Sequence, residues 1–394
     1  MRLRFRRASG EDDSFQTGRV IAVAGGHAVH DTYAAFLPPL LPVFVERLAL
    51  SNTGAGLLSA FSQVPALLQP AIGHLADRRD LRYAVVLAPA VGGVLMSSLG
   101  WAESYAVLAI LLTVAGINIA ALHAVGPPAV GRLSGTRLGR GMAFWMVGGE
   151  LGRTLGPLVA ASTVALLSLR GLASVMVVGL AASWVLARRL RDAPLEPDPD
   201  AVRVSWRGGL RAMRRVMVPL AGLVAARGLA MVAATVYLPI FLTDEGLSLW
   251  MAGAALSVLE AAGVAGALSG GWVSDRVGRR AVLLSAFLAA PVMMIGFLLV
   301  EGWARLPLLL LLGFTLLSIQ PVMMALAQEA APESRAFANG VYLAISFGVR
   351  TVAAIGFGLI ADTAGLSAAM LIAAAVMVAG APVTLLLPGR GPVR

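Results

Sequence analysis

Charged side chains interrupt several long apolar segments of this sequence. Glu150 and Arg153 lie in the middle of one of them, and their three-residue spacing puts both on one face of a helix, where they can touch. Because a charge at membrane depth is costly, it persists mainly with a partner or beside a water-filled cavity. Groups of this kind can exchange protons, bind an anionic or zwitterionic molecule, or pair with one another. The set comprises the carboxylates of Asp31, Glu150 and Glu260 and the guanidiniums of Arg153, Arg227 and Arg350.

Asp31 is the carboxylate whose position most favours proton transfer. It lies about twelve residues into the first apolar segment, near the bilayer centre at about 1.5 Å per residue. A carboxylate at that depth can change its protonation during a conformational cycle, so we expect Asp31 to couple protons, with His27 one turn earlier as modulator. A fixed ion pair or hydrogen bond to a neighbouring helix is one alternative, and direct contact with a bound molecule is another. His30 points away from His27, and we expect it to pack.

The composition is that of a helical membrane protein. Of 394 residues, 58% are hydrophobic and 13% are charged, and the mean hydropathy is +0.82. Soluble domains carry about 25% charge. The absence of cysteine excludes disulfides and thiolate chemistry. The four histidines show no metal-site spacing, and there is no nucleophile–base set or phosphate-binding loop, so we expect neither an enzyme nor a metal site.

Apolar stretches of roughly 20 residues recur along the chain and predict an all-α membrane protein with twelve transmembrane helices. Basic residues concentrate in every second connection, which predicts a multi-pass protein of a bacterial cytoplasmic membrane with both termini in the cytoplasm. This topology accounts for the formal net charge of +10 without a nucleic-acid partner. The predicted helices span residues 19–45, 54–74, 83–101, 104–128, 141–168, 171–187, 216–243, 248–272, 281–300, 306–328, 339–361 and 365–387.

The two halves of the chain match each other at a nearly constant offset. The pattern predicts an N-terminal six-helix half (1–187), a cytoplasmic linker with a basic interfacial helix (188–215) and a C-terminal six-helix half (216–394). Parallel repeats of this kind are typical of transporters. The matching pairs are Pro42 and Pro239, Gly56 and Gly253, Gln63 and Glu260, His123 and Gln320, and Arg153 and Arg350.

A basic loop motif occurs once in each half, after the second and the eighth predicted helices. With its two copies at equivalent positions, the chain resembles the major facilitator superfamily, whose loop reads G-x-L-x-D-R-x-G-R-[KR]. We expect its glycines to let helices of the two halves approach closely, and its aspartate to cap a neighbouring helix. The matching residues, expected to act in gating, are Gly73, Asp77 and Arg78, and Gly271, Asp275, Arg276, Gly278 and Arg279.

Three further segments resemble the fosmidomycin-resistance branch of that superfamily. Residues 27–31 read H-x-x-x-D, residues 68–73 read L-Q-P-x-x-G, and His123 lies in the fourth predicted helix. The fifth helix carries Gly148, Gly152, Gly156 and Pro157, similar to the antiporter motif of that helix, and we expect this stripe to pack at the seam between the halves. Glu150 stands where the branch has Asn, and Arg153 where it has a small residue.

The resemblance implies a secondary active transporter that works by alternating access. Members of the branch are proton-linked, so we expect proton-coupled efflux of small amphiphilic or anionic compounds by a monomer in contact with membrane lipid. The energy source is then a proton gradient, and no cofactor is needed. Proton-coupled uptake of an organic anion, sugar or lipid-like molecule is the alternative. Candidates for proton coupling are Asp31, His27, Glu150 and Glu260, and candidates for substrate binding are His123, Arg153, Arg227, Gln320 and Arg350.

Overall fold

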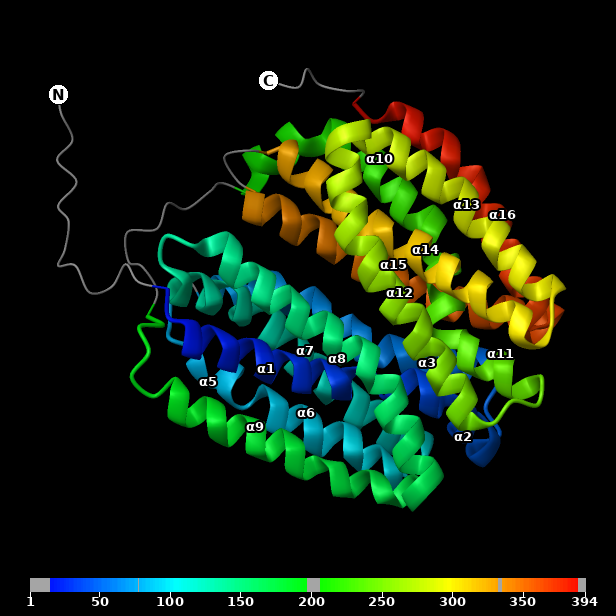
Figure 1. Ribbon diagram of the computed structural model, residues 1–394, viewed down its shortest axis with the longest axis horizontal. Helices are drawn as coiled ribbons and strands as arrows, with labels where there is room; N and C mark the ends of the chain where they lie inside the picture. The colour runs from blue at the N-terminus through cyan, green and yellow to red at the C-terminus, as the bar shows by residue number, and fades with distance from the viewer. Residues whose placement is uncertain (1–14, 77, 197–205, 332–334, 389–394) are drawn as a thin grey trace.

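The computed structural model describes residues 15–76, 78–196, 206–331 and 335–388, and every element in these ranges is helical (Figure 1). Nine helices of the described part are long and apolar enough to cross a membrane. The helical segments 17–48, 82–101 and 138–167 run among them and complete the twelve predicted passes. The all-α membrane architecture predicted from the sequence is therefore confirmed.

The N-terminal half contains six passes, three of them built from more than one helix. The first pass breaks at residues 35–36, and its second helix starts with prolines in its first turn, where a missing backbone N–H costs nothing. The elements are α1 (Thr17–Ala34), α2 (Leu37–Leu48), α3 (Asn52–Gln63), η1 (Val64–Leu68), α4 (Gln69–Ala76), α5 (Arg82–Val86), α6 (Ala88–Ser97), η2 (Ser98–Trp101), α7 (Tyr105–Ser134), α8 (Leu138–Leu167), η3 (Leu169–Val175) and α9 (Met176–Arg189).

The C-terminal half repeats this arrangement. Its first helix begins at Trp206, ten residues before the predicted 216, so the basic segment 206–215 continues directly into the membrane helix. The elements are α10 (Trp206–Val232), the π-helical turn η4 (Ala233–Tyr237), α11 (Leu238–Asp244), α12 (Leu249–Val277), α13 (Arg279–Leu299), η5 (Gly302–Ala304), α14 (Arg305–Glu329), α15 (Arg335–Ala364), α16 (Leu366–Gly380) and η6 (Ala381–Leu386).

The internal repeat appears in how the helices begin. Ser51 caps α3 by accepting a hydrogen bond from the Gly54 amide, and Ser248, its repeat equivalent, caps α12 by accepting one from the Met251 amide. A serine oxygen in this position satisfies an amide that has no partner within the helix. Equivalent residues thus fix the start of equivalent helices in the two halves.

The halves touch along α3 with α15 and along α8 with α12. The repeat-equivalent glycines are part of this contact, because a Cβ atom at Gly56 would strike the Ala354 carbonyl and one at Gly253 would lie 2.6 Å from the Cβ of Ala161. At the same end of the molecule, Asp362 of α15 accepts hydrogen bonds from the Asn52 and Thr53 amides and so caps α3 across the seam. In Figure 1 the ribbons of the two halves converge there and diverge toward the opposite end.

The loop-motif glycines do not make the close approach that the motif predicts. A Cβ atom at Gly73 or Gly271 would meet no described atom within 4 Å. The prediction that these glycines hold the halves together is therefore wrong for this conformation, in which Gly56 and Gly253 have that role.

The glycine stripe of α8 packs against α1 within the same half. A Cβ atom at Gly152 would lie 2.5 Å from the Ala28 carbonyl oxygen and 2.7 Å from the Cβ of Asp31, and Gly148 and Gly156 approach α1 equally closely. The helix lies at the seam as predicted, since α8 packs against α12, but its glycines face α1. Within this stripe it is the carbonyl of Pro157 that lies near Gly253 of the other half. The stripe brings α8 against the face of α1 that carries Asp31.

We predict that Gly152→Val destabilises the protein by about 1–3 kcal/mol or more, because the new side chain would force α8 away from α1. Gly139, also on α8, has open space around it, and Gly139→Val is the matched control. Thermal unfolding of the purified variants in detergent measures the difference. Equal unfolding temperatures for the two variants would show that the close approach does not contribute to stability.

Candidate functional site

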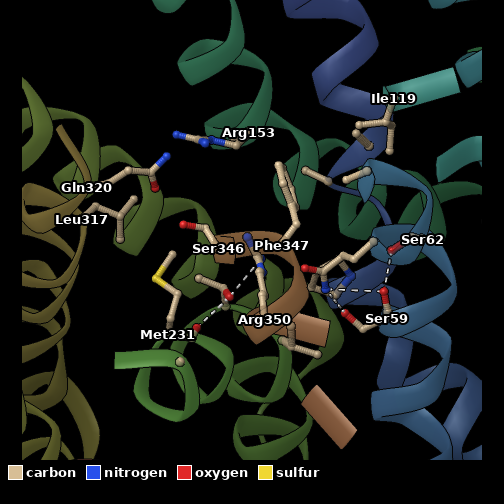
Figure 2. A pocket seen from close by; sticks show the side chains of 18 of the residues that line it. Ser59, Ser62, Ile119, Arg153, Met231, Leu317, Gln320, Ser346, Phe347 and Arg350 are labelled. Carbon is tan, nitrogen blue, oxygen red and sulfur yellow. Dashed lines mark hydrogen bonds between the residues drawn. The ribbon is translucent and has the colours of Figure 1, made fainter. Parts of the chain in front are cut away.

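A cavity of about 270 Å³ lies between the two halves, at mid-length of the helices. Side chains from α1, α3, α7 and α8 line it on one side, and side chains from α10, α12, α14 and α15 line it on the other. Figure 2 shows Arg153, Gln320 and Arg350 projecting into the same space from three different helices. All five residues predicted to bind substrate line this cavity, namely His123, Arg153, Arg227, Gln320 and Arg350.

Arg153 is the cavity arginine that has a carboxylate partner. Its guanidinium donates a hydrogen bond to Glu150, one turn earlier on α8. The spacing-based prediction of this contact is confirmed. Glu150 itself does not line the cavity and contacts the lining residue Arg153; its part in proton coupling stays a prediction.

Arg227 and Arg350 have no such partner. In the part of the chain that the structure describes, no carboxylate oxygen lies within 4.0 Å of either guanidinium. Arg227 donates only to the sulfur of Met231, at 3.3 Å, and Arg350 only to the hydroxyl of Thr235, at 3.3 Å. The Nε atoms of both arginines are buried without a hydrogen-bond partner. An arginine does not shed its charge on burial, so in the described ranges the two present positive charge to the cavity without an ion pair shorter than 4.0 Å.

Glu260 is a carboxylate that interacts electrostatically with Arg350. It lines the cavity from α12 and interacts electrostatically with Arg153 and Arg350. In the described ranges it makes no ion pair shorter than 4.0 Å and no hydrogen bond. Its repeat equivalent Gln63 lines the opposite wall, where its amide donates to the hydroxyl of Ser59 at 2.9 Å. Glu260 is thus free to change partners.

Asp31 lies among histidines and not among arginines. His27 Nε2 is 3.2 Å and His123 Nε2 is 3.6 Å from Asp31 Oδ2, while His30 Nδ1 is 2.8 Å from Asp31 Oδ1. The predicted contact between His27 and Asp31 is present. The prediction of a mere packing role for His30 is wrong, because its ring turns back to the neighbouring carboxylate. His123 was predicted to contact substrate and also touches Asp31 from α7, a pairing that spacing along the chain does not reveal.

The loop motif of the second half forms a local ion-pair network. Arg279 lies 2.6 Å from Asp275 and 2.8 Å from Glu329 at the end of α14, and the Arg276 guanidinium stacks 3.4 Å over the Trp272 ring. Gly278 has φ = 100°, a conformation that favours glycine, and it joins α12 to α13. The aspartate therefore pairs with its own loop in this conformation.

The copy of the motif in the first half is described only in part. Asp77 lies outside the described residues. The backbone amide of Arg78 donates to the Leu75 carbonyl in the turn that follows α4.

We predict that Glu150→Gln and Arg153→Gln are not additive. Breaking an ion pair leaves one charge uncompensated, whereas removing both charges does not. Because the Arg153 side chain is 40% exposed and its charge is screened, the double variant is expected to be milder than the sum of the single ones by about 0.5–1 kcal/mol. Thermal unfolding of the four proteins measures this coupling. A double variant whose loss equals the sum of the single losses would show that the pair contributes nothing beyond each residue alone.

The arrangement of two repeated helical halves around a central polar cavity agrees with one family model. The model of the Major Facilitator Superfamily matches residues 23–354. The chain belongs to this superfamily. It is 25% identical over 358 residues to the fosmidomycin resistance protein of Escherichia coli (strain K12), covering 86% of each chain. It is 24% identical over 369 residues to an uncharacterized MFS-type transporter of Bacillus subtilis (strain 168), covering 90% of this chain and 89% of that protein.

Solved structures of transporters have the same fold. A bacterial homolog of the human lysosomal transporter Spinster, inward-facing and unoccupied, matches with a TM-score of 0.81 and 14% identity over 96% of this chain and 97% of that one. A variant of the nucleoside transporter NupG matches with a TM-score of 0.74 and 15% identity over 93% of this chain and 98% of that one. This superfamily member is a multi-pass membrane transporter and not an enzyme.

Proposed function

We propose that this transporter exports small anionic or zwitterionic molecules in exchange for protons. The observation that carries the proposal is a pair of cavity-lining arginines, the buried Arg227 and the partly exposed Arg350, which have no carboxylate partner within 4.0 Å in the described ranges. Buried charge of this kind is stabilised by a ligand of opposite sign. A phosphonate, phosphate or carboxylate offers planar or forked oxygens that a guanidinium binds through two parallel hydrogen bonds.

Glu260 supplies the link to protons. As a carboxylate it accepts hydrogen bonds, so a substrate that carries an ammonium, N–H or hydroxyl donor beside its anionic group binds both Arg350 and Glu260. Protonation removes the negative charge that attracts a cationic group and turns one acceptor oxygen into an O–H donor. This weakens, without abolishing, the binding of the donor group of the substrate, so proton and substrate compete for the same residue. Competition at one site is what exchange requires, because only one of the two is carried in each direction.

An anion without such a donor would behave differently. It would favour the protonated form of Glu260, since a neutral neighbour repels it less than a carboxylate does, and anion and proton would then travel together. This is the uptake alternative. The similarity to a protein named for fosmidomycin resistance supports export.

The same proposal includes location and assembly. The arginine-rich connections support a place in a bacterial cytoplasmic membrane with both termini inside. Because the cavity is lined by the two halves of one chain, a monomer has a complete site. The proton gradient supplies the energy, and no organic cofactor takes part.

A susceptibility panel in an efflux-deficient bacterial host tests the proposed function. Expression is expected to protect against phosphonate or carboxylate compounds that also carry a donor group, with fosmidomycin as first probe, and a proton uncoupler is expected to abolish this protection. Neutral and purely cationic compounds of similar size serve as controls. Equal protection against all classes, or protection that survives the uncoupler, would contradict it.

A further inference from the structure

The cluster around Asp31 has the geometry of a metal site. His27 Nε2, His123 Nε2 and Asp31 Oδ2 are separated by 3.2, 3.4 and 3.6 Å. In a tetrahedral zinc site with bonds of about 2.0 Å, neighbouring ligand atoms lie about 3.3 Å apart. The point equidistant from the three atoms in their plane is about 2.0 Å from each, the length of a bond from zinc to nitrogen or oxygen.

Hydrogen bonds on the far sides of the rings orient electron pairs toward that point. His27 Nδ1 lies 3.0 Å from the Trp145 carbonyl oxygen, and His123 Nδ1 lies 2.9 Å from the Ile119 carbonyl oxygen. A carbonyl oxygen only accepts, so both Nδ1 atoms carry hydrogen, and in the neutral rings both Nε2 atoms carry lone pairs. Two nitrogen lone pairs and a carboxylate oxygen then face one another, and a cation between them is needed to hold them together.

The carboxylate is oriented in the same way. His30 Nδ1 donates to Asp31 Oδ1 at 2.8 Å, which leaves Oδ2 to face the two Nε2 atoms. Each of the three converging groups therefore has an outer hydrogen bond that fixes its direction. Outer partners of this kind, a backbone carbonyl for each histidine and a donor for the carboxylate, are a regular feature of protein metal sites.

The site is buried but open to the cavity. His27 and Asp31 are 4% and 6% exposed, and His27 stacks on the Trp145 ring with the ring centres 3.6 Å apart. Asp31 and His123 are both part of the cavity wall, so a fourth coordination position points toward the cavity. An imidazole-rich set with one carboxylate selects a transition metal ion over magnesium or calcium, which bind oxygen ligands.

We propose that His27, His123 and Asp31 bind one divalent transition metal ion of the zinc type, with a fourth position open to the transport cavity. His30 is a positioning residue for the carboxylate. The open position is where water, or an anionic oxygen of a molecule in the cavity, binds the ion. Its ligands do not include Arg227, Arg350 or Glu260, so metal binding can be tested separately from the proposed function.

Cobalt binding to the purified full-length protein, prepared with a tag free of histidine, tests the proposal. The wild type is expected to take up one Co²⁺ per chain with the absorption bands of a tetrahedral site, and Zn²⁺ is expected to displace it. His27→Gln and His123→Ala are expected to weaken binding by about 100-fold or more, since removal of even an outer partner costs about 10- to 100-fold. His74, exposed on α4, provides the control, and His74→Ala is expected to bind like the wild type.

If the variants fail to fold, a measurement on the wild-type protein alone still tests the proposal. X-ray absorption of the zinc-loaded wild type is expected to show two imidazoles and oxygen ligands at about 2.0–2.1 Å. A spectrum without imidazole scattering, or equal cobalt binding by the wild type and His123→Ala, would overturn the proposal and leave protons as the cations of this cluster. The susceptibility panel tests the proposed transport function, for which the argued residues are Arg227, Arg350 and Glu260. The metal site and the transport function can therefore each be contradicted without the other.

Discussion

Replacing Arg350 with glutamine is expected to weaken binding of the anionic substrate by about 10- to 100-fold, since hydrogen bonds to charged groups are worth about 1.5–3 kcal/mol each. Arg350 lines the cavity and, among the described residues, makes one side-chain hydrogen bond, to the Thr235 hydroxyl, so donors of its terminal nitrogens remain for a ligand. The concentration dependence of substrate uptake by everted membrane vesicles measures the effect. Arg227→Gln is expected to act in the same direction.

Two further variants separate loss of the ligand contact from loss of the fold. Arg350→Lys keeps the charge but not the forked donor pair, so it is expected to retain part of the affinity. Arg170 is exposed in a connection and pairs with Glu103 at 3.5 Å, so Arg170→Gln removes one positive charge far from the cavity. It is expected to transport like the wild type. An Arg350→Gln variant with unchanged substrate affinity would rule out this guanidinium as the anion site.

Glu260→Gln is expected to abolish proton-driven transport while substrate exchange across the membrane continues. An amide does not titrate, but its carbonyl oxygen still accepts a hydrogen bond from the substrate. Gln63 occupies the repeat-equivalent position in the other half. This indicates that the cavity wall accommodates an amide side chain at such a position. Counterflow in proteoliposomes without a pH gradient measures exchange, and accumulation under an imposed gradient measures coupling.

Two outcomes would count against a coupling role for Glu260. If Glu260→Gln accumulates substrate under a pH gradient as the wild type does, protons enter through another group. If it loses counterflow as well, Glu260 is needed for substrate binding and the coupling role is unsupported. Only loss of accumulation with retained counterflow agrees with competition between proton and substrate at this carboxylate.

Much of the fold could be predicted because membrane helices have strong local signals. Apolar runs of about 20 residues, serine caps such as Ser51 and Ser248, and the offset between the halves all act within a single segment or repeat. The start of α10 was missed by ten residues because a helix that leaves the apolar region keeps its backbone hydrogen bonds in water, and the polar sequence gives no stop signal.

The site could be predicted as a set of residues but not as a set of contacts. Burial of charge singles out Asp31, Glu260 and the three arginines, and all of these line the cavity. Which groups pair depends on helix rotation, which the sequence does not specify. The spacing within α1 and α8 predicts the contacts of His27 with Asp31 and of Glu150 with Arg153, whereas the approach of His123 requires α7 to face α1 at the right height.

The glycine patterns show the same limit. Glycine marks a close approach of helices but does not say which helix approaches. The stripe on α8 packs against α1 in its own half. In this conformation a Cβ atom added at the loop-motif glycines Gly73 or Gly271 would have no neighbour within 4 Å beyond its own helix, while Gly56 and Gly253 bring the halves together. A repeat match indicates equivalent positions in the two halves. The equivalent glycines Gly56 and Gly253 both lie at the contact between the halves.

Proton movement on addition of substrate to everted vesicles tests the central claim most directly. Respiration acidifies the vesicle lumen, and a pH-sensitive dye reports its pH. With the compound that the susceptibility panel selects, proton-coupled export predicts that protons leave the lumen and that its pH rises in vesicles with the wild type but not with Glu260→Gln. No change of pH during substrate uptake, or a fall in lumenal pH as substrate and protons enter together, would contradict it.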